Sequence, residues 1–217
     1  MKRHIRLLSS VTALIVLSAP MIPTAANAQD VKKQRLINKS YDVTAEDRLT
    51  IDNQFGNVVV TTWDKQQITV DIEISARAAS DGKAQGIMDK IDVHESRSGR
   101  EIRFKTNVDE IHNANGNKGH GEENGRGFYI DYVVHMPAAN PLSIENSFGK
   151  TEVPAMRGPV SLTSKFGSLN AGKLDNVDQI DVEFGKADID AINNGKISLK
   201  FDKQTRIGKV EGSARIS

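Results

Sequence analysis

Cysteine is absent from the 217-residue chain, and aromatic residues make up only 5% of it. Without cysteine, neither a disulfide nor a thiolate can hold the fold or act in catalysis. With so few aromatic residues, the core must consist mainly of Ile, Val and Leu, a composition that favours β-strands. The sequence also lacks the motifs G-x-S-x-G, H-E-x-x-H and G-x-x-x-x-G-K-[ST], which excludes these three signatures of hydrolases, zinc proteases and nucleotide-binding proteins.

The first 28 residues have the pattern of a secretory signal peptide. A basic start, MKRHIR, precedes the apolar run LLSSVTALIVLSAPMI, and the small residues Ala26 and Ala28 mark a cleavage site. The apolar run is shorter than a spanning helix requires and ends in prolines, so we expect no transmembrane segment in the mature chain. The sequence therefore predicts an exported protein that is periplasmic, associated with the outer membrane or extracellular.

Charge is nearly balanced in the mature chain. Removal of Lys2, Arg3 and Arg6 with the signal peptide leaves 26 basic residues against 28 acidic ones, a net charge of −2. Proteins that bind nucleic acid use a clear surplus of Lys and Arg to neutralise phosphates. The composition thus argues against a nucleic-acid partner.

A ten-residue pattern occurs five times, as IDNQFGNVVV (51), IENSFGKTEV (144), LTSKFGSLNA (162), IDVEFGKADI (180) and ISLKFDKQTR (197). Because strand side chains alternate, its first, third and fifth positions share one face, which we predict to be buried. Gly after Phe is expected to supply a bend through a positive φ, a role that Asp202 takes in the last copy. The predicted repeat core comprises Ile51, Phe55, Gly56, Ile144, Phe148, Gly149, Leu162, Phe166, Gly167, Ile180, Phe184, Gly185, Ile197 and Phe201. Truncating one of these stacked Phe side chains to Ala should then cost about 3–5 kcal/mol.

The agreement between copies extends over a whole coil. The last four copies begin 18, 18 and 17 residues apart, and turn signals such as GP, DN and NNG separate them. Apolar residues recur five and eight positions after Phe, as in Val153 and Met156. One such unit cannot bury its own face, whereas stacked units share a continuous core. Asn53 and Asn146, at the third position, can hydrogen-bond along the stack.

The sequence therefore predicts an all-β fold in which residues 142–217 form a single-stranded β-helix-like solenoid. Residues 29–141 are predicted to form a β-rich part with one short helix, capped by Asp81, and a hairpin that turns at Ser98-Gly99. The Gly- and Asn-rich stretch 109–127 is predicted to be a surface loop. Ile216-Ser217 repeats the opening of the previous coil, so we expect a truncated chain, a frayed last coil, or an open coil through which the protein can self-associate.

These motifs resemble a bacterial family of β-strand-repeat domains of unknown function, called adhesin-like and common in cell-envelope proteins. The resemblance rests on the series I-x-N-x-F-G-x-x-x-V, on the helical pattern from Ala79 to Ile91, and on Y-x-V-x-M-P from Tyr132 to Pro137. It covers nearly all of the mature chain. It implies a β-helix-like fold outside the cytoplasm and supplies no catalytic residues.

No catalytic, cofactor-binding or metal site is predicted. Among the histidines, His112 and His120 lie in the Gly-rich loop without fixed geometry, and His94 and His135 lie in predicted strands, so a metal site is disfavoured. Carboxylates crowd one coil, at Asp181, Glu183, Asp188 and Asp190. Asp181 and Glu183 alternate with buried positions and so face outward, in the same outer rows as Lys165 and Lys200, which indicates ion pairing between coils.

The primary functional hypothesis is a non-enzymatic envelope protein, an adhesin-like binding or scaffold module that presents a solenoid face to an unidentified envelope protein or glycan. One alternative is a small carbohydrate-active enzyme that uses the carboxylates of residues 180–190. Another is a periplasmic regulatory partner of a membrane signalling protein, which only the predicted compartment supports. No cofactor is expected under the primary hypothesis.

Overall fold

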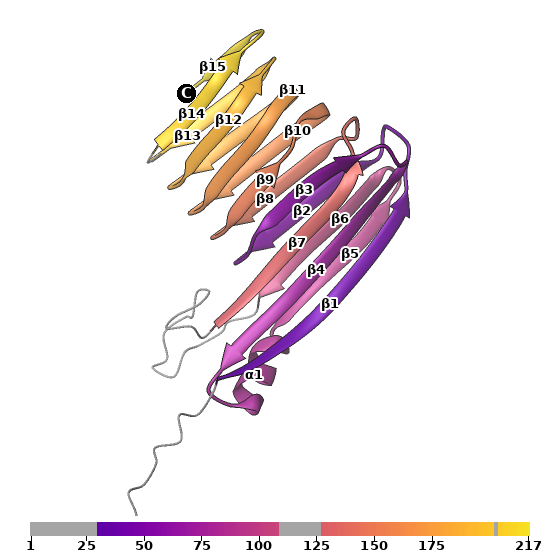
Figure 1. Cartoon of the computed structure of the whole chain (residues 1–217), viewed down its shortest axis with the longest axis vertical. Helices are drawn as coiled ribbons and strands as arrows, with labels where there is room; N and C mark the ends of the chain where they lie inside the picture. The colour runs from indigo at the N-terminus through magenta and orange to yellow at the C-terminus, as the bar shows by residue number, and fades with distance from the viewer. Residues whose placement is uncertain (1–29, 109–126, 202–203) are drawn as a thin grey trace, which may run out of the picture.

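The computed structural model describes residues 30–108, 127–201 and 204–217. These residues are mostly β-strand with one helix, and their strands form one curled, open sheet (Figure 1). The predicted signal peptide, all of the predicted loop except Gly127, and Asp202 lie outside the described residues. Within the described ranges, no helix is long and apolar enough to cross a membrane.

The N-terminal part contains seven strands and the helix. They are β1 (Val31–Asp42), β2 (Arg48–Gln54), β3 (Val58–Trp63), β4 (Gln67–Ala78), α1 (Asp81–Met88), β5 (Ile91–Ser98), β6 (Glu101–Val108) and β7 (Gly127–Pro137). The repeat part follows with β8 (Leu142–Ser147), β9 (Lys150–Val153), β10 (Met156–Lys165), β11 (Ser168–Glu183), β12 (Lys186–Ile192), β13 (Gly195–Lys200), β14 (Gln204–Val210) and β15 (Ala214–Ile216). The buried hydrophobic cluster draws residues from both parts.

Two parallel ladders run along the molecule, and each sequence copy contributes a strand to both. The first ladder runs from β6 through β2 and β8 to the C-terminal part of β10, then to the C-terminal part of β11, and on to β13 and β15. The second joins β7, β3, β9, the start of β11, β12 and β14. The aligned columns include Ile51, Ile144, Leu162, Ile180 and Ile197; Val153, Ala171 and Ile189; and Met156, Leu174 and Ile192. The predicted correspondence between copies is therefore confirmed.

Antiparallel strands close the stack at its N-terminal end. β5 pairs with β6, while β4 and then β1 extend the ladder beyond β7. β1 and β5 are the two edge strands of the sheet at this end, and a side chain joins them: Arg35 of β1 donates to the Ile91 carbonyl of β5. The helix α1 lies at this end (Figure 1) and is held to β1 by a Lys33–Asp81 ion pair of 3.0 Å. The end of the core is thus covered by strands, a helix and their side-chain contacts.

Two local predictions in this region have different outcomes. The hairpin between β5 and β6 exists, and Gly99 adopts a φ of 57° in its turn. The prediction that Asp81 caps the helix is wrong, because the N-cap is Ser80, whose hydroxyl accepts from the Lys83 N–H at 3.4 Å. Asp81 is instead the first helical residue, where a carboxylate still interacts favourably with the helix dipole.

A column of buried polar side chains crosses the first ladder. The Asn53 amide donates to the Asn146 side-chain oxygen at 3.2 Å and to the Ile130 carbonyl at 3.1 Å. The Asn146 amide donates to the Gly56 carbonyl at 3.1 Å and to the Thr151 hydroxyl at 3.2 Å. The predicted hydrogen bonding along the stack is confirmed, and it satisfies amides that would otherwise be costly to bury.

The column extends into a coil that the Phe-Gly pattern does not mark. Thr106 of β6 donates to the Asn53 oxygen at 3.1 Å and lies 2.8 Å from the Tyr132 hydroxyl of β7. Burial raises the pKa of the Tyr132 phenol, so this group keeps its proton. Because Phe104 pairs with Ile51 in register, β6 and β7 occupy the place of a further coil in the two ladders.

The prediction that the repeat phenylalanines stack inside is wrong for all but the first. Phe55 is buried, whereas Phe148, Phe166, Phe184 and Phe201 are exposed at the surface. The reason is the backbone, since all five phenylalanines have a φ between 50° and 61°. Phe55 shares this conformation, but its ring is packed against Phe128, with ring centroids 5.2 Å apart. This left-handed conformation ends the strand alternation and turns the side chain outward at a corner between the ladders.

The predicted role of the glycine after Phe is also wrong. The glycine does not carry the positive φ; it is required because the corners of neighbouring coils approach closely. A Cβ at Gly149 would lie 1.8 Å from the Gly56 carbonyl oxygen, and one at Gly167 would lie 2.0 Å from that of Gly149. No side chain fits between backbones at that separation.

The exposed position of Phe166 lowers the expected cost of its truncation. Phe166→Ala removes two stacked ring contacts of about 0.5–1.5 kcal/mol each, so the free energy of unfolding should fall by about 1–3 kcal/mol. The buried Ile180→Ala variant should lose more, about 2–5 kcal/mol. Urea denaturation followed by circular dichroism measures both values. Equal costs would show that Phe166 contributes as a core residue.

Candidate functional site

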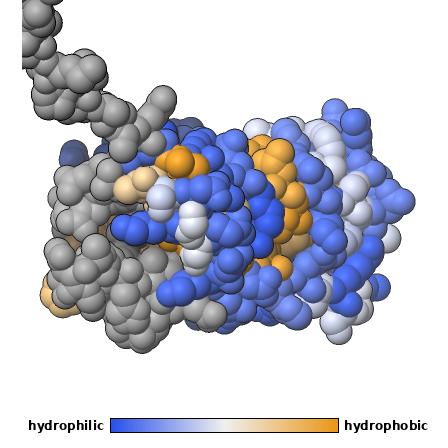
Figure 2. Space-filling view, turned by 90° about the horizontal axis from the view of Figure 1, so that it is seen from below, coloured by the Kyte–Doolittle hydropathy of each residue, from blue (hydrophilic) through white to orange (hydrophobic). Residues whose placement is uncertain are grey.

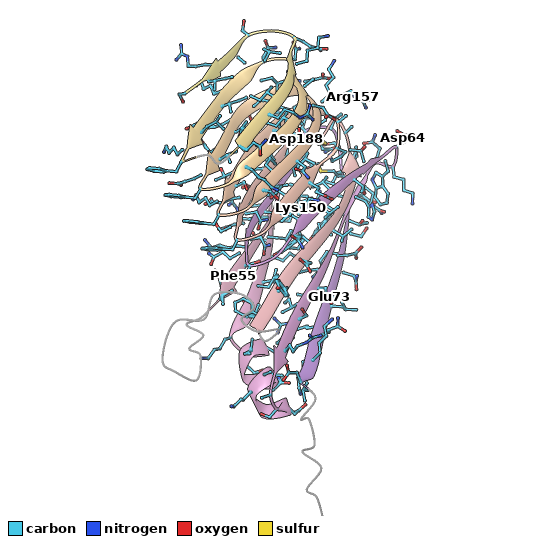
Figure 3. All side chains as sticks on the ribbon, turned by 60° about the vertical axis from the view of Figure 1, so that its left-hand side comes forward. Phe55, Asp64, Glu73, Lys150, Arg157 and Asp188 are labelled. Carbon is cyan, nitrogen blue, oxygen red and sulfur yellow. The ribbon has the colours of Figure 1, made fainter. Side chains whose placement is uncertain are left out.

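The exposed phenylalanines form a continuous ridge along the corner between the two ladders. We call Phe148, Phe166, Phe184 and Phe201 the phenylalanine ridge. Successive ring centroids are 5.0, 5.0 and 4.7 Å apart, and the ring planes differ by no more than 6°. Phe55 continues the row toward the N-terminal end, where its ring stacks on Phe148 at 5.1 Å. Figure 3 shows Phe55 at the lower end of a row of flat rings that projects from the repeat strands.

The backbone holds the ridge in register with the coils. The Phe166 N–H donates to the Glu183 carbonyl at 2.9 Å, and the Phe184 N–H donates to the Lys200 carbonyl at 3.0 Å. After the corner, the Ser168 N–H donates to the Gly149 carbonyl at 3.2 Å. Because the ladder hydrogen bonds continue through the bend, the rings repeat at the spacing of the strands.

Stacking decides which part of each ring a ligand can reach. The faces of Phe166 and Phe184 lie against neighbouring rings, while the side chains of the ridge remain 38–73% exposed. The accessible surface therefore consists mainly of ring edges, arranged as a narrow apolar strip. In the view from the α1 end, the described surface is mainly hydrophilic, with hydrophobic residues in a band and in a smaller separate patch (Figure 2).

Lysines flank the ridge on both sides. The position before Phe is Ser147, Lys165, Glu183 and Lys200 in successive coils. The position two after Phe is Lys150, Ser168 and Lys186 in the first three coils of the ridge, and Gln204 pairs in register with Lys186 in the last coil. The Lys165 ammonium donates to Glu145 at 2.6 Å, which raises the pKa of that lysine, and Lys150 pairs with Glu152. Lys186 and Lys200 are exposed and have no ion pair in the part of the chain that the structure describes.

Lys165 makes an ion pair between coils, but its partner is Glu145 of the preceding copy. Within the described residues, no ion pair joins Lys165 or Lys200 to Asp181 or Glu183, the carboxylates that the sequence suggested as partners. Lys165 and Lys200 lie in one outer row, but Glu183 lies between them, in register with both. The row therefore alternates in charge along the stack. Such exposed pairs contribute about 0–1 kcal/mol to stability.

The four carboxylates of residues 180–190 do not form one cluster. Asp181 and Glu183 lie at the end of β11 in the first ladder, whereas Asp188 and Asp190 lie on β12 in the second. The corner at Phe184 separates the two pairs. Asp188 binds the Arg206 guanidinium at 2.6 Å, and Asp190 lies 3.9 Å from the same group.

The described histidines are also distributed. His94 is exposed on β5, and His135 on β7 stacks on Trp63 with ring centroids 5.3 Å apart. His112 and His120 lie outside the described residues. In the described ranges, no three His, Asp or Glu side chains are placed to hold a metal ion.

Comparison with known proteins provides shape similarities only. The sequence matches no protein-family profile and no curated protein sequence. A solved candidate cell adhesion protein from Clostridium sporogenes ATCC 15579 aligns over 86% of this chain and 99% of its own, with a TM-score of 0.37 and 8% identity. A candidate adhesin from Parabacteroides distasonis ATCC 8503 aligns over 84% and 78%, with a TM-score of 0.35 and 10% identity. A candidate lipid-binding protein from the same organism aligns over 84% and 96%, with a TM-score of 0.28 and 10% identity. Similarity at this level does not assign this chain to a family.

Proposed function

We propose that this chain is an exported, non-enzymatic cell-envelope protein that acts as an adhesin-like binding or scaffold module. In this proposal, residues 1–28 are a signal peptide, residues 29–141 form the base, and residues 142–217 form a single-stranded β-solenoid. The signal-peptide pattern supports export, and the in-register parallel pairing of β8 to β15 supports the solenoid.

The phenylalanine ridge is the observation that carries the binding role. Four bulky residues occupy a left-handed conformation that non-glycine residues rarely adopt, and this conformation directs them away from the core. Gly or Asn would satisfy the same backbone with less strain. A contiguous exposed apolar strip is typical of an interaction site.

The carbohydrate-active enzyme remains the competing hypothesis. It requires carboxylates that act together on one substrate, and the corner at Phe184 separates Asp181 and Glu183 from Asp188 and Asp190. The pairing of Asp188 with Arg206 further engages one of these groups. We therefore propose that these carboxylates keep the solenoid faces polar and do not catalyse a reaction.

Incubation of the purified protein with fractionated bacterial envelope material tests the proposal. We expect specific retention of the protein, with no new glycan or peptide ends in the material. The variant Phe166→Asn/Phe184→Asn should lose most of this retention, because Asn tolerates the left-handed backbone but removes the rings. The variant Asp181→Ala/Glu183→Ala serves as control and should be retained like the parent protein. New chain ends that disappear in this control variant would instead establish the enzyme.

A further inference from the structure

We propose that the phenylalanine ridge and its flanking lysines dock the protein on a lipid bilayer surface that carries anionic headgroups. This inference rests on the proposed binding function and names the partner of the same site. Its basis is the combination of an exposed apolar strip with lysines on both sides, since proteins that lie at a membrane interface combine aromatic side chains with Lys and Arg. The ring edges would enter the headgroup region, and the ammonium groups would contact phosphates.

The stacking of the rings argues against a sugar as the ligand. Aromatic side chains bind sugars through their open faces, and the faces of Phe166 and Phe184 are covered on both sides by neighbouring rings at 4.7–5.0 Å. Ring edges offer hydrocarbon contact without a flat platform. Such contact suits the disordered acyl and glycerol region of a bilayer, which adapts to the shape of the ridge.

The charges argue against a second copy of the chain. Two ridges placed against each other would bring the lysines beside each ridge toward those of the other, and like charges at an interface are unfavourable. Lys186 and Lys200, which are exposed and have no ion pair among the described residues, would have to lose water in both copies while facing further lysines. Anionic headgroups supply the missing counter-charge, so charge complementarity favours the bilayer.

Apart from Glu183, the described carboxylates beside the ridge lie farther along the chain from the corner than the lysines. Glu145 and Asp181 are three residues before Phe, and Glu152 and Asp188 are four residues after it, on the two sheet faces. Glu183 is the one acidic residue among the four that immediately precede the ridge phenylalanines. A bilayer that contacts the corner would therefore meet the rings, the lysines and Glu183 before the other described carboxylates.

Co-sedimentation with vesicles tests this inference. The probes are vesicles of phosphatidylcholine alone and vesicles of phosphatidylcholine mixed with phosphatidylglycerol. We expect the protein to sediment with the mixed vesicles, and we expect added NaCl to release it. The variant Lys186→Gln/Lys200→Gln should bind about thirtyfold more weakly, because each lysine near an anionic surface contributes about 1 kcal/mol. The variant Phe166→Asn/Phe184→Asn should also lose binding while its circular dichroism spectrum is retained.

A charge-matched control separates the ridge from the net charge. Lys83 and Lys196 are exposed lysines away from the corner, on α1 and β13. Lys83→Gln/Lys196→Gln should bind within about twofold of the parent protein.

Equal losses in the two lysine variants, equal binding to both kinds of vesicle, or no binding at all would each overturn the inference. A ridge-dependent dimer detected by analytical ultracentrifugation would do the same. Ridge-dependent retention on envelope proteins or glycans without vesicle binding would overturn the lipid partner alone and leave the proposed function intact.

Discussion

Gly149→Ala is expected to abolish the stable native stack. The added Cβ would lie 1.8 Å from the Gly56 carbonyl oxygen, which is a backbone atom in the neighbouring coil and cannot rotate away. Relief requires that two coils separate at the corner, and this breaks ladder hydrogen bonds on both sides. We expect the free energy of unfolding to fall by more than about 4 kcal/mol, a loss reserved for severe core or backbone conflicts. Urea denaturation followed by far-UV circular dichroism measures it.

Gly86→Ala provides the matched control for the same chemical change. A Cβ at Gly86, in α1, would have no atom within 4 Å, and the position is helical. Alanine is favoured over glycine in a helix by about 1 kcal/mol, so this variant should be as stable as the parent protein or more stable. If Gly149→Ala unfolds at the same urea concentration as Gly86→Ala, the coils are farther apart at the corner than the structure indicates.

The second large effect is expected for the buried polar column. Asn146→Ala removes the acceptor for Asn53 and the donor to the Gly56 carbonyl and the Thr151 hydroxyl. Buried groups that lose their partners cost about 1–3 kcal/mol each, so we expect a loss of about 3–5 kcal/mol in the free energy of unfolding. Thermal and urea unfolding, monitored on the same samples, give the value.

Ser164→Ala is the control for that prediction, because Ser164 occupies the next place in the same column. Its hydroxyl is buried and makes no hydrogen bond within the described residues. The following place holds Val182, so an apolar side chain is already accommodated in the column. We expect Ser164→Ala to change the free energy of unfolding by less than about 1 kcal/mol. A loss as large as that of Asn146→Ala would mean that burial alone sets the cost, and that the amide hydrogen bonds do not.

The sequence was sufficient to predict which residues align between coils, and insufficient to predict the corner. Ile51, Ile144 and Leu162 align as predicted because a strand alternates with a fixed period and a regular spacing preserves the register. Phe166 violates the alternation because its own φ is left-handed, a conformation that its residue type does not favour. The Phe-Gly signal therefore predicts correctly where each coil turns, but the inward orientation predicted for the Phe side chain is wrong for Phe148, Phe166, Phe184 and Phe201.

The candidate site was missed for the same physical reason. A phenylalanine in a β-rich repeat is normally a core residue, so its exposure depends on a backbone angle that residue type does not reveal. The coil formed by β6 and β7 was missed because it has no Phe-Gly, although Thr106 and Phe104 occupy positions equivalent to Asn53 and Ile51. Only the register between strands distant in sequence identifies it.

The closed N-terminal end has a consequence for how the chain can fold as it is made. Residues 30–141 bring together β1 to β7 and α1, including both strands on which the repeats stack. A chain that emerges from its N-terminus can therefore complete this base before the repeats appear. Each later coil then needs only to pair with the one before it, at a separation of about one coil, so the entropy of loop closure stays small at every step. The strands of the base set the register of the first repeat coil, and each later coil takes its register from the coil before it, in the order in which the chain emerges.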